Sequence, residues 1–554
     1  MSEHLRRIVH RDPPAWTGIK FRCAKLHRVV DSTGEATSHY NTIYDVLKSR
    51  GWKEWGAPAN VTAMGAGGGG GAASSTTAST RGQQGQQQQT DVGEMGNNSC
   101  ADNDELQNAT TVASQQQHTS AVTNSTAASA TTSAGTATAA PLSRADRDGM
   151  KQDWHIFWAD KDWIHSELEK LHLEPHQKVN HFRNHYEITR KDLLSKNVKR
   201  HKRMLEREGR WEEAAKYNVL PVTFVLPQEY SMFVEEFRRV GGVWIMKPVG
   251  RSQGTGIFMV TKLSQIQQWK PAESSAIGGG YGRGAGGGRG NKDHGDAMLH
   301  DEEGPEAYIV QKYIEKPLLI GGRKFDLRIY ALVTGYQPLT VWLSREGFAR
   351  FSLTRYSADS VRDPAKLSSH LTNVAVQKNL FSKDNTYQRT GGKWEIPRMK
   401  QYLINKIGRE RTKDLFLQFE DIIIYSLLAV QKVIIADRHC FEMYGFDIMI
   451  DADYRAILIE VNASPSLTAN TKADYDMKFG TLDDLLTILD FEKYLSGSET
   501  RVGGFDLIYK GGPVPGHTES MLGTRNDRQE SLKKLAQEVQ LRALVGVNGK
   551  AEGG

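Results

Sequence analysis

The clearest structural signal in the chain lies between residues 444 and 462, which read YGFDIMIDADYRAILIEVN. Two apolar segments flank the polar residues 451–454, and this pattern predicts an antiparallel hairpin with those residues as its loop. In that register Ile450 lies opposite Arg455, and opposed residues share one face of the sheet. The pattern therefore predicts one apolar face, made of Phe446, Ile448, Ile450, Ile457, Ile459 and Val461.

The opposite face of this hairpin brings together side chains that carry oxygen. Asp447, Glu460 and Asn462 fall on it, and the sequence ASPS follows at 463–466. Two carboxylates and an amide oxygen form a ligand set that suits Mg²⁺, an ion that also keeps waters and nucleotide phosphates. The alternative is an acidic hairpin with one solvated face, which would not need an opposite face this apolar. We therefore predict these three residues as metal ligands.

Residues 323–333, RKFDLRIYALV, predict a strand with two contrasting faces. Side chains alternate along a strand, so the apolar side takes Phe325, Leu327, Ile329 and Val333, and the charged side takes Lys324, Asp326 and Arg328. Such a charged face is either an exposed sheet surface or the floor of a polar cleft. The predicted magnesium site on the hairpin at 444–462 favours the second alternative, the floor of a polar cleft.

Residues 246–258, MKPVGRSQGTGIF, combine a strand-borne lysine, Lys247, with a Gly-x-Gly turn that ends at Gly256. Glycines let backbone N–H groups approach a phosphate closely, and the ammonium group adds a point charge. The pattern is neither a Walker loop nor the dinucleotide-binding fingerprint. It indicates a phosphate-binding loop, with a plain glycine turn after a core strand as the alternative.

Two low-complexity tracts interrupt an otherwise ordinary composition. Residues 57–143 have no aromatic residue and residues 271–306 include a glycine-rich run, and each tract holds 11 of the 53 glycines of the 554-residue chain. Segments of this kind cannot bury a core. Each tract has a net charge of −4, so the formal charge rises from +6 for the whole chain to +14 for the rest. A basic folded part indicates an anionic partner, and composition leaves open whether that is nucleic acid, a membrane or an acidic protein segment.

The cysteines and the apolar runs indicate the cellular compartment. Cys23, Cys100 and Cys440 are far apart and form no CxxC pair, which argues against a disulfide scaffold or a structural zinc site and favours a reducing compartment. The first residues lack the apolar segment of a secretory signal. The longest apolar run, residues 422–430, is too short to cross a bilayer and indicates a buried helix. We expect a soluble protein of the cytoplasm.

Periodicity predicts the remaining elements. Residues 187–217 predict a helix rich in Lys and Arg, residues 397–438 a mostly helical region, and residues 526–545 a basic polar helix. Further strands are expected at 153–158, 243–248, 308–314, 324–334 and 339–343. Strands mixed with helices over this length indicate an α+β or α/β fold.

A lysine-bearing strand, a glycine loop, a charged strand and a terminal Asp…Glu-x-Asn hairpin together resemble the ATP-grasp arrangement. Within that group, four blocks resemble the signatures of the tubulin tyrosine ligase-like family: QKYIEKP at 311–317, RKFDLR at 323–328, HLTN at 370–373 and LIEVNASPSL at 458–467. NHFRNHYE at 180–187 and RVGGFDL at 501–507 are similar to the ninth-member branch, regarded as ciliary tubulin polyglutamylases. The resemblance covers about residues 150–510 and also 19–55.

The resemblance implies an α+β, ATP-grasp-like tubulin tyrosine ligase fold. It divides the chain into an N-terminal domain (19–56 and 150–186, split by a disordered insertion at 57–147), a central domain (187–316, with a disordered insertion at 271–306), a C-terminal domain with the magnesium hairpin (317–510), and a basic polar tail (511–554).

The resemblance also implies roles for individual residues. Lys247 and Lys324 would hold ATP phosphates below a mobile loop of Gln253, Gly254, Thr255 and Gly256. The remaining nucleotide contacts would come from Lys191, Gln311, Lys312, Tyr313, Ile314, Phe325, Asp326, Thr372 and Asn373, with the backbone of Tyr313 and Ile314 reading the adenine edge. Asp447, Glu460 and Asn462 would carry magnesium. Lys324, Arg328 and Arg350 would be catalytic, and the amino-acid substrate would meet Arg328, Arg350 and Lys478.

The implied activity is ATP-dependent addition of free glutamate to glutamate side chains in the acidic C-terminal tail of tubulin, through an acyl phosphate. The basic folded part fits such a tail, with positive charge concentrated at Lys191, Lys196, Lys199, Arg200, Lys202, Arg203, Arg207 and Arg210; the alternative for this run is an ordinary solvated helix. The implied location is the cytoplasm and cytoskeleton, at the axoneme or basal body of a cilium or flagellum.

Other partners and other functions are also considered. Accessory subunits are further partners, and neither nucleic acid nor a membrane is expected. One alternative is a ligase of the same family that uses glycine, tyrosine or another protein acceptor. A second alternative is a non-catalytic microtubule-binding scaffold, which would be expected to have lost some of the predicted lysines and carboxylates.

Overall fold

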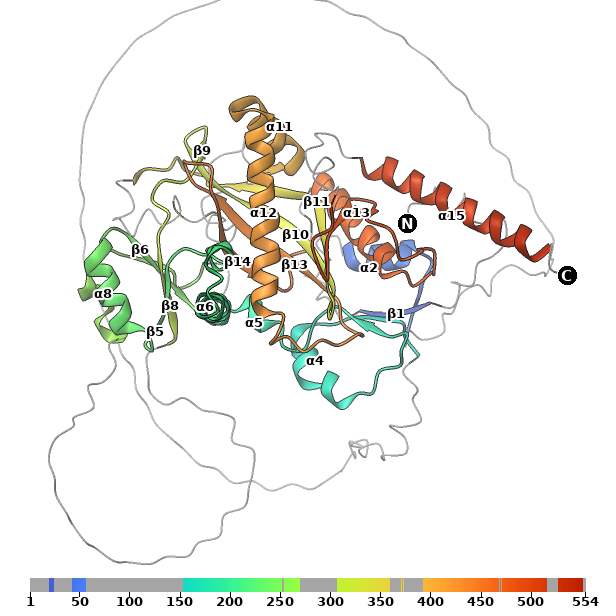
Figure 1. The fold of residues 1–554 in the computed structure, drawn as a ribbon, viewed down its shortest axis with the longest axis horizontal. Coiled ribbons are helices and arrows are strands. Elements are labelled where there is room, and N and C mark those ends of the chain that lie inside the picture. The colour runs from blue at the N-terminus through green and yellow to red at the C-terminus, as the bar shows by residue number, and fades with distance from the viewer. Residues whose placement is uncertain are drawn as a thin grey trace, which may run out of the picture. The chain divides into compact units, whose positions relative to one another are not determined.

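A long antiparallel hairpin is the centre of the largest sheet in the computed structural model (Figure 1). Its strands are β10 (Arg323–Tyr336) and β11 (Leu339–Phe351). The strand order is β14-β13-β10-β11-β16-β15, and β9 and β12 pair with β10 and β11. The other strands span β9 Leu319–Ile320, β12 Lys393–Glu395, β13 Glu442–Ile450, β14 Ala456–Asn462, β15 Arg501–Val502 and β16 Phe505–Lys510.

The structure describes residues 19–23, 42–55, 153–251, 254–269, 306–358, 370, 372, 392–467, 469, 471–515 and 527–551, with side chains as far as Arg542. The predicted insertion at 57–147 and residues 271–305 of the second insertion lie outside the described residues, as do Gln253 and Asn373. None of the described helices is both long enough and apolar enough to cross a membrane.

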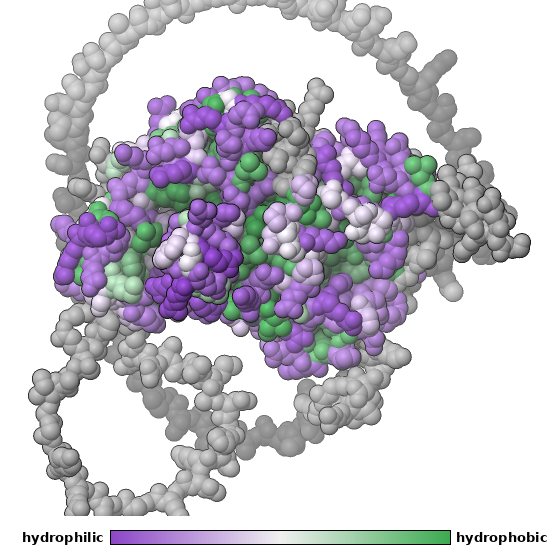
Figure 2. All heavy atoms as spheres, viewed as in Figure 1, coloured by the Kyte–Doolittle hydropathy of each residue, from purple (hydrophilic) through white to green (hydrophobic). Residues whose placement is uncertain are grey.

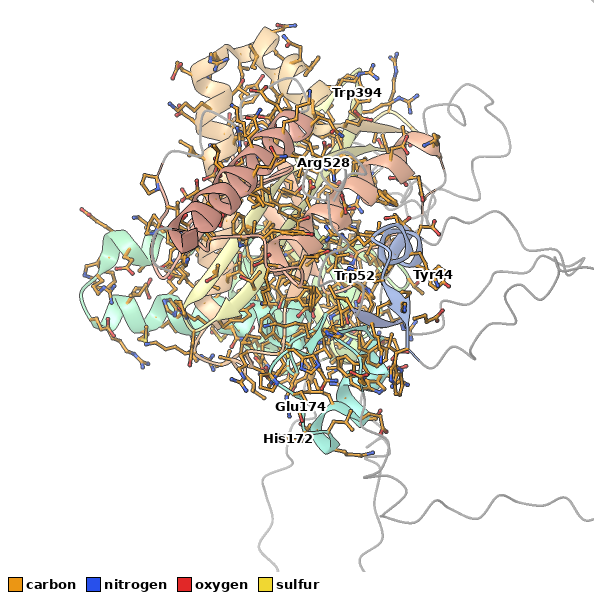
Figure 3. The ribbon with its side chains drawn as sticks, turned by 90° about the vertical axis from the view of Figure 1, so that its right-hand side faces the viewer. Tyr44, Trp52, His172, Glu174, Trp394 and Arg528 are labelled. Atoms are coloured by element: carbon orange, nitrogen blue, oxygen red, sulfur yellow. The ribbon has the colours of Figure 1, made fainter. Side chains whose placement is uncertain are left out.

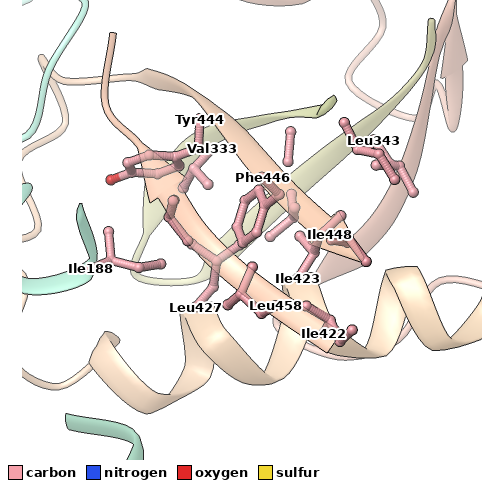
Figure 4. Close-up of a cluster of buried hydrophobic side chains, with 14 of the residues drawn as sticks. Ile188, Val333, Leu343, Ile422, Ile423, Leu427, Tyr444, Phe446, Ile448 and Leu458 are labelled. Atoms are coloured by element: carbon pink, nitrogen blue, oxygen red, sulfur yellow. The ribbon is translucent and has the colours of Figure 1, made fainter. Parts of the chain in front are cut away.

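Strict alternation along β10 gives the large sheet an apolar face and a polar face, as the sequence predicts. Phe325, Leu327, Ile329 and Val333 are buried in the main core, whereas Lys324 and Asp326 line a cavity on the other side. Helix α12 (Arg409–Val430) covers the apolar face. Its residues Ile422, Ile423 and Leu427 point at Phe446, Ile448 and Leu458 of the sheet (Figure 4).

The predicted helical region at 397–438 forms two helices, α11 (Ile396–Ile407) and α12. Gly408 separates them with a φ of +84°, a backbone conformation that favours glycine. The predicted helix at 187–217 is wrong as a single element, because it divides into α5 (Tyr186–Thr189), α6 (Lys191–Arg207) and α7 (Trp211–Lys216). Arg190 has extended backbone and Gly209 has a φ of +74°, so neither position continues a helix.

The register of the β13–β14 hairpin differs from the predicted one. Ile450 pairs with Ala456, so the loop spans 451–455 rather than 451–454, and a bulge separates the Ile448–Leu458 pair from the Asp447–Glu460 pair. The predicted apolar face is therefore wrong for two residues, since Leu458 packs in the core while Ile459 lines the cavity and Ile457 pairs with Met449. An extra residue in one strand resets the alternation beyond it.

A second sheet has four antiparallel strands in the order β5-β8-β6-β7. They span β5 Thr223–Leu226, β6 Trp244–Pro248, β7 Phe258–Val260 and β8 Tyr308–Lys312, with α8 (Tyr230–Val240) and the 3₁₀ segment η3 (Leu263–Trp269) beside them. Phe233, Trp244 and Trp269 fill the core on one face. Lys247 and Gln311 therefore lie on the opposite face.

A third, parallel sheet joins chain segments that are distant in sequence. Its order is β2-β1-β3-β4, from β1 (Lys20–Cys23), β2 (Lys53–Glu54), β3 (Ile156–Trp158) and β4 (Lys178–Val179). The segment 156–158 corresponds to the end of the predicted strand at 153–158. Below it lie α4 (Lys161–Ser166) and the 3₁₀ turn η2 (Leu168–Lys170). Together these elements place residues 20–23 and 53–54 beside residues 156–158 and 178–179.

A second apolar core packs on the polar face of the large sheet, beyond Arg328 toward the C-terminal end of β10. Tyr330 and Leu332 of β10 belong there to one buried cluster with residues of α13 (Lys472–Leu489) and α2 (Thr42–Ser49). Trp52, on the same N-terminal segment as Tyr44 (Figure 3), packs edge-on against Phe491 with ring centroids 5.4 Å apart. Helix α13 is therefore positioned against both the large sheet and the N-terminal segment.

The predicted basic tail begins with a docked helix. Helix α15 (Arg528–Ala551) confirms the helix expected at 526–545, and its first turn is anchored by Arg528, labelled in Figure 3. Arg528 forms ion pairs with Asp483 at 3.0 Å and with Asp484 at 2.7 Å, both on α13. Asp483 also pairs with buried Arg50, at the end of α2.

Candidate nucleotide and amino-acid site

One cavity lies between the β5–β8 sheet and the polar face of the large sheet. Most of the nucleotide and metal residues predicted from the sequence line it: Lys191, Lys247, Gly254, Thr255, Gln311, Lys312, Tyr313, Ile314, Lys324, Asp326, Thr372, Asp447 and Glu460. These residues come from α6, β6, β8, β10, β13, β14 and the connecting loops. The large sheet and the second sheet thus bring distant motifs to one place.

Some predicted residues lie elsewhere. The side chain of Phe325 packs in the main core against Phe351, with ring centroids 5.4 Å apart, so its predicted contact with nucleotide is wrong for the side chain. Alternation along β10 is the reason, because Phe325 sits between the two residues that face the cavity. Gly256 does not line the cavity, but its carbonyl accepts a hydrogen bond from Tyr308 Oη at 3.2 Å.

Two buried lysines occupy the cavity wall. Lys247 Nζ donates to Gln311 Oε1 at 2.8 Å, and Gln311 in turn donates to Thr223 Oγ1 at 2.9 Å. Lys324 Nζ donates to Tyr313 Oη and to the His370 carbonyl, both at 3.0 Å. Burial lowers the pKa of Lys247 to about 8 and the pKa of Lys324 to about 7. An anion in the cavity would restore their full charge, because a nearby opposite charge favours the charged form.

The loop after β6 approaches the same cavity. Gly254 and Gly256 have φ values of +81° and +74°, which supports the predicted need for glycine in this turn. Lys191 Nζ, at the start of α6, donates to the Arg251 carbonyl at 3.0 Å. This contact ties the loop to the helix that carries the predicted nucleotide contact Lys191.

Guanidinium and carboxylate groups alternate across the polar face of the large sheet. Arg328 binds Asp447 through Nε at 2.6 Å and Nη2 at 3.0 Å, and Arg350 Nη2 reaches the same carboxylate at 2.8 Å. Arg350 also binds Asp326 through Nε at 2.7 Å and Nη2 at 2.6 Å, and Thr372 Oγ1 donates to Asp326 at 2.8 Å. Arg328 and Arg350 thus stand directly behind two carboxylates that line the cavity.

The two carboxylates of the predicted metal set have opposite electrostatic environments. Burial acts to raise the pKa of Asp447, but the charges of Arg328 and Arg350 outweigh it and hold that pKa well below its usual range. Burial and the negative charge of Asp447 raise the pKa of Glu460. The two residues are direct cross-strand partners, and Asn462 Nδ2 lies 3.3 Å from Asp447 Oδ2. A divalent cation would relieve the repulsion between these two adjacent carboxylates, so this donor set fits Mg²⁺.

A histidine–carboxylate cluster lies outside this cavity. His181, His185 and Glu442 are buried, and their potential ligand atoms lie within 4.8 Å of one another. Glu442 Oε1 pairs with His181 Nδ1 at 2.8 Å, and Glu442 Oε2 accepts the Phe182 N–H at 3.1 Å. Hydrogen bonding therefore accounts for this cluster without a metal ion.

The structure also reveals site residues that sequence reasoning missed. His370 Nδ1 lies 3.0 Å from Tyr313 Oη, next to Lys324. Lys478, predicted to meet the amino acid, donates to Asp474 Oδ2 at 2.9 Å, and Lys393 lies 3.4 Å from the same oxygen. The four-residue spacing of Asp474 and Lys478 on one helix is a signal that could have found Asp474. Lys393 lies 81 residues away in sequence, and no local signal connects it to them.

The basic run on α6 and α7 is partly neutralised within the protein. Lys199 pairs with Glu229 at 2.9 Å, Lys202 pairs with Glu206 at 3.8 Å, and Arg210 pairs with Glu208 at 3.0 Å. Lys196, Arg203 and Arg207 are exposed. Hydrophilic residues gather over α6 on the face shown in Figure 2. A smaller basic surface remains than the sequence suggests.

Comparison with known proteins gives a consistent set of relatives. The sequence profile of the tubulin-tyrosine ligase family matches residues 169–496. The chain is 45% identical over 407 residues to the probable tubulin polyglutamylase TTLL9 of Bos taurus, covering 70% of this chain and 87% of the relative. It is 41% identical to the probable tubulin polyglutamylase ttll-9 of Caenorhabditis elegans, covering 69% and 86%. It is 42% identical to the probable alpha-tubulin polyglutamylase Ttll1 of Tetrahymena thermophila, covering 65% and 86%.

Proposed function

Because the chain belongs to the tubulin-tyrosine ligase family and is therefore a ligase, we propose that it uses ATP to add glutamate to glutamate side chains in the acidic C-terminal tail of tubulin. The observation that carries this proposal is a single cavity that holds two buried lysines, Lys247 and Lys324, together with the buried carboxylate of Asp447 and the half-buried carboxylate of Glu460. Lysines suit phosphates, and the carboxylates with Asn462 suit a divalent cation.

The reaction needs an activated carboxyl group, because a carboxylate is a poor acyl donor. Transfer of the γ-phosphoryl group of ATP to the acceptor glutamate gives an acyl phosphate, and the amine of the incoming amino acid then displaces phosphate and forms an amide bond. Lys247 and Lys324 would neutralise the charge that develops on the transferred group. Magnesium, when bound at Asp447, Glu460 and Asn462, would supply further positive charge there.

Arg328 and Arg350 are the proposed binding groups for a carboxylate of the incoming amino acid. Their contacts with Asp447 and Asp326 use Nε and Nη2 of each guanidinium. Arginine carries five N–H donors in a planar fork, so Nη1 can face the substrate while the other nitrogens stay bound. The two aspartates thus orient the arginines and keep them charged.

The choice of tubulin and glutamate is supported by the relatives named above, which are probable tubulin polyglutamylases. The exposed positive charge of Lys196, Arg203 and Arg207 on α6 fits an acidic acceptor tail. We further propose a cytoskeletal location at cilia or flagella, with accessory subunits as further partners. A ligase for glycine, tyrosine or another acceptor, and a non-catalytic scaffold, are the competing functions.

Incubation of the full-length protein with Mg-ATP, radiolabelled glutamate and microtubules tests the proposal. We expect label in the tubulin tails, and no label with glycine or tyrosine in place of glutamate. Incorporation of glycine or tyrosine instead would identify the same-family alternative. No incorporation of any amino acid, with and without a ciliary extract as a source of accessory subunits, would favour the scaffold.

Glu460→Gln is the matched catalytic variant. It removes a proposed metal ligand but keeps the side-chain shape, so we expect ligation to be lost. Since burial and Asp447 raise the pKa of Glu460, its charge destabilises the empty protein at neutral pH, and the variant should unfold at a temperature equal to or above that of wild type. Retained ligation in Glu460→Gln would contradict the magnesium assignment.

A further inference from the structure

The segment NHFRNHYE at 180–187 contributes no residue to the proposed reaction, yet its polar side chains bind several distant parts of the chain. Asn180 Oδ1 accepts the Ala159 N–H at 2.8 Å, next to the end of β3. Asn184 Oδ1 accepts the Ile435 N–H at 2.9 Å, beyond the end of α12. The segment therefore joins the parallel sheet to the chain that connects α12 with β13, and its histidines lie beside the start of β13.

His181 is the middle member of a series of three hydrogen-bonded side chains. Its Nδ1 lies 2.8 Å from Oε1 of Glu442, the first residue of β13. Its Nε2 lies 3.3 Å from Oγ of Ser464, two residues beyond the end of β14. In a neutral imidazole that donates from Nδ1 to the carboxylate, Nε2 is the acceptor for the serine hydroxyl. The series thus connects the start of one strand of the β13–β14 hairpin with the chain that leaves the other.

The members of this series differ in burial. His181 is 2% exposed and Glu442 is fully buried, whereas Ser464 is exposed. Glu442 Oε2 also accepts the Phe182 N–H at 3.1 Å, so both oxygens of the carboxylate are engaged by the segment 180–187. A buried polar group with satisfied hydrogen bonds has a fixed orientation. The imidazole is therefore held from the inside of the protein, and it offers Nε2 as a fixed point for the exposed serine.

The serine follows the proposed metal ligand Asn462, which lies where the sheet pairing stops. The pair Gly445–Asn462 is the last pair between β13 and β14 on this side of the hairpin. Asn462 Nδ2 donates to the Gly445 carbonyl and to Asp447 Oδ2, so the amide oxygen is the atom that would bind a cation. Strand pairing fixes the backbone only as far as Asn462, and the direction in which that oxygen points depends on the residues that follow.

The chain beyond Asn462 is in turn held by two contacts. Pro465 is buried and packs closely on the hairpin, since a Cβ atom added to Gly445 would lie 3.0 Å from Pro465 Cβ. The hydrogen bond of Ser464 to His181 lies between that contact and Asn462 in sequence. Because it is only two residues from Asn462, a change in this hydrogen bond would be transmitted to the metal ligand through a very short piece of backbone.

We propose that His181, oriented by Glu442, is a positioning residue for the metal site: through Ser464 it holds the chain that follows Asn462, and it thereby keeps the Asn462 amide oxygen directed at the cation. This inference rests on the proposed function, which places a divalent cation at that residue. It gives the segment 180–187 a role in the reaction although none of its residues touches a substrate. The alternative is that His181 only joins the N-terminal part of the chain to β13, in which case the serine hydroxyl would contribute nothing to cation binding.

Binding of Mn²⁺, a paramagnetic substitute for Mg²⁺, tests the proposal by EPR spectroscopy of the full-length protein with a saturating non-hydrolysable ATP analogue. Ser464→Ala removes one exposed hydroxyl, and we expect it to weaken the Mn²⁺ affinity by about threefold to tenfold, the range for loss of one hydrogen bond. Ser464→Thr keeps the hydroxyl and should bind Mn²⁺ as wild type does. Ser166→Ala is the matched control, because Ser166 is an exposed serine at the end of α4, and it should also equal wild type.

A double-mutant cycle shows whether the histidine acts through the serine. His181→Asn keeps an amide that can donate to Glu442 but is too short to reach Ser464. It should weaken Mn²⁺ binding as much as Ser464→Ala does, and the double variant should bind no more weakly than either single variant, because all three lack the same contact. Weaker Mn²⁺ binding in His181→Asn with unchanged binding in Ser464→Ala would overturn the proposal, and so would additive losses in the double variant.

The same measurements separate this inference from the proposed function, because Mn²⁺ binding requires no ligation. If Ser464→Ala binds Mn²⁺ more weakly and Ser464→Thr does not, the positioning role stands even where no ligation occurs. If wild type and all variants bind Mn²⁺ equally, the positioning role is wrong while the metal site stands. If wild type binds no Mn²⁺, the magnesium assignment of the proposed function is wrong, and this inference is wrong with it.

Discussion

At the scale of single residues, the two lysines of the cavity wall are buried and hydrogen-bonded. Lys247 and Lys324 are held by neutral groups, Gln311 and Tyr313, rather than by carboxylates. A carboxylate partner would keep each lysine charged but would compete with a phosphate. Neutral partners position the amines and leave the positive charge for the nucleotide.

This arrangement predicts a pH-dependent affinity for ATP. The lowered pKa values, about 8 for Lys247 and about 7 for Lys324, mean that the empty site loses positive charge as the pH rises through 7 to 8. A bound nucleotide restores the protons, so its affinity should fall by about tenfold per pH unit for each lysine above these values. Titration of an ATP analogue between pH 6.5 and 9 measures this.

The same two lysines have the opposite effect on stability: the free energy of unfolding rises with pH, whereas the nucleotide affinity falls. The unfolded chain keeps its lysines protonated up to about pH 10.4, so between about pH 7 and 10 it binds more protons than the empty folded protein, and these two lysines make the folded state more stable as the pH rises. Lys247→Met should weaken both trends. A nucleotide affinity that is constant over this range would show that the two amines stay charged in the empty site.

Gly445 shows how closely the backbone approaches the arginine–aspartate pair. A Cβ atom at Gly445 would lie 3.0 Å from Arg328 Cδ and 3.0 Å from Pro465 Cβ. Gly445→Ala should therefore displace the Arg328 side chain from Asp447 and lower kcat/KM for the amino acid by about tenfold or more. Gly335→Ala is the control, because its nearest neighbour, the Pro338 carbonyl oxygen, is 3.6 Å away. Equal kinetics for the two variants would contradict the prediction.

At the scale of elements, the sequence predicts which segments form strands better than it predicts how they pair. The two strands of the 442–462 hairpin and the shared face of Asp447, Glu460 and Asn462 are confirmed. The predicted register is wrong, because one extra residue in β14, Ile459, shifts the alternation of side chains by one position. No local sequence pattern indicates this bulge. The alternation along β10 is predictable because that strand is buried on one side over its whole length.

The residues missed at the site share one physical cause. Asp474 and Lys393 come together only because α13 packs on the sheet to which β12 belongs, and packing of distant elements leaves no periodic trace in the sequence. Lys478 was predicted by resemblance, and its partner Asp474 lies one helical turn away. Lys393 sits on a three-residue strand, which is too short to be recognised from its sequence pattern.

At the scale of the whole molecule, a buried network of charges fixes α13. Arg50 from the N-terminal segment and Arg528 from the tail both bind Asp483, and Arg528 also binds Asp484. Asp484 accepts the Gly504 N–H at 2.7 Å as well. Three distant parts of the chain therefore meet at the C-terminal half of the helix that carries Asp474 and Lys478 near its start.

This network predicts that the first turn of the tail contributes to stability. Arg528→Met would leave Asp484 buried with one charged partner fewer, so the free energy of unfolding should fall by about 3 kcal/mol. Lys534→Met, which breaks an exposed pair on the same helix, should change it by less than about 0.5 kcal/mol. Denaturant unfolding of both variants measures the difference, and equal midpoints would show that the tail helix is not an integral part of the fold.

The buried network of charges on α13 also restricts which substitutions this sequence can accept during evolution. Asp483 faces two arginines that lie 433 residues before it and 45 residues after it in the chain. Substitution of any one of these three residues would leave a buried charge without a partner. A substitution at one position is therefore tolerated only when at least one of the other two positions changes with it. Positions 50, 483 and 528 are therefore expected to be inherited as a set, and chimaeras that exchange only the N-terminal segment or only the tail between relatives should fold poorly unless all three residues match.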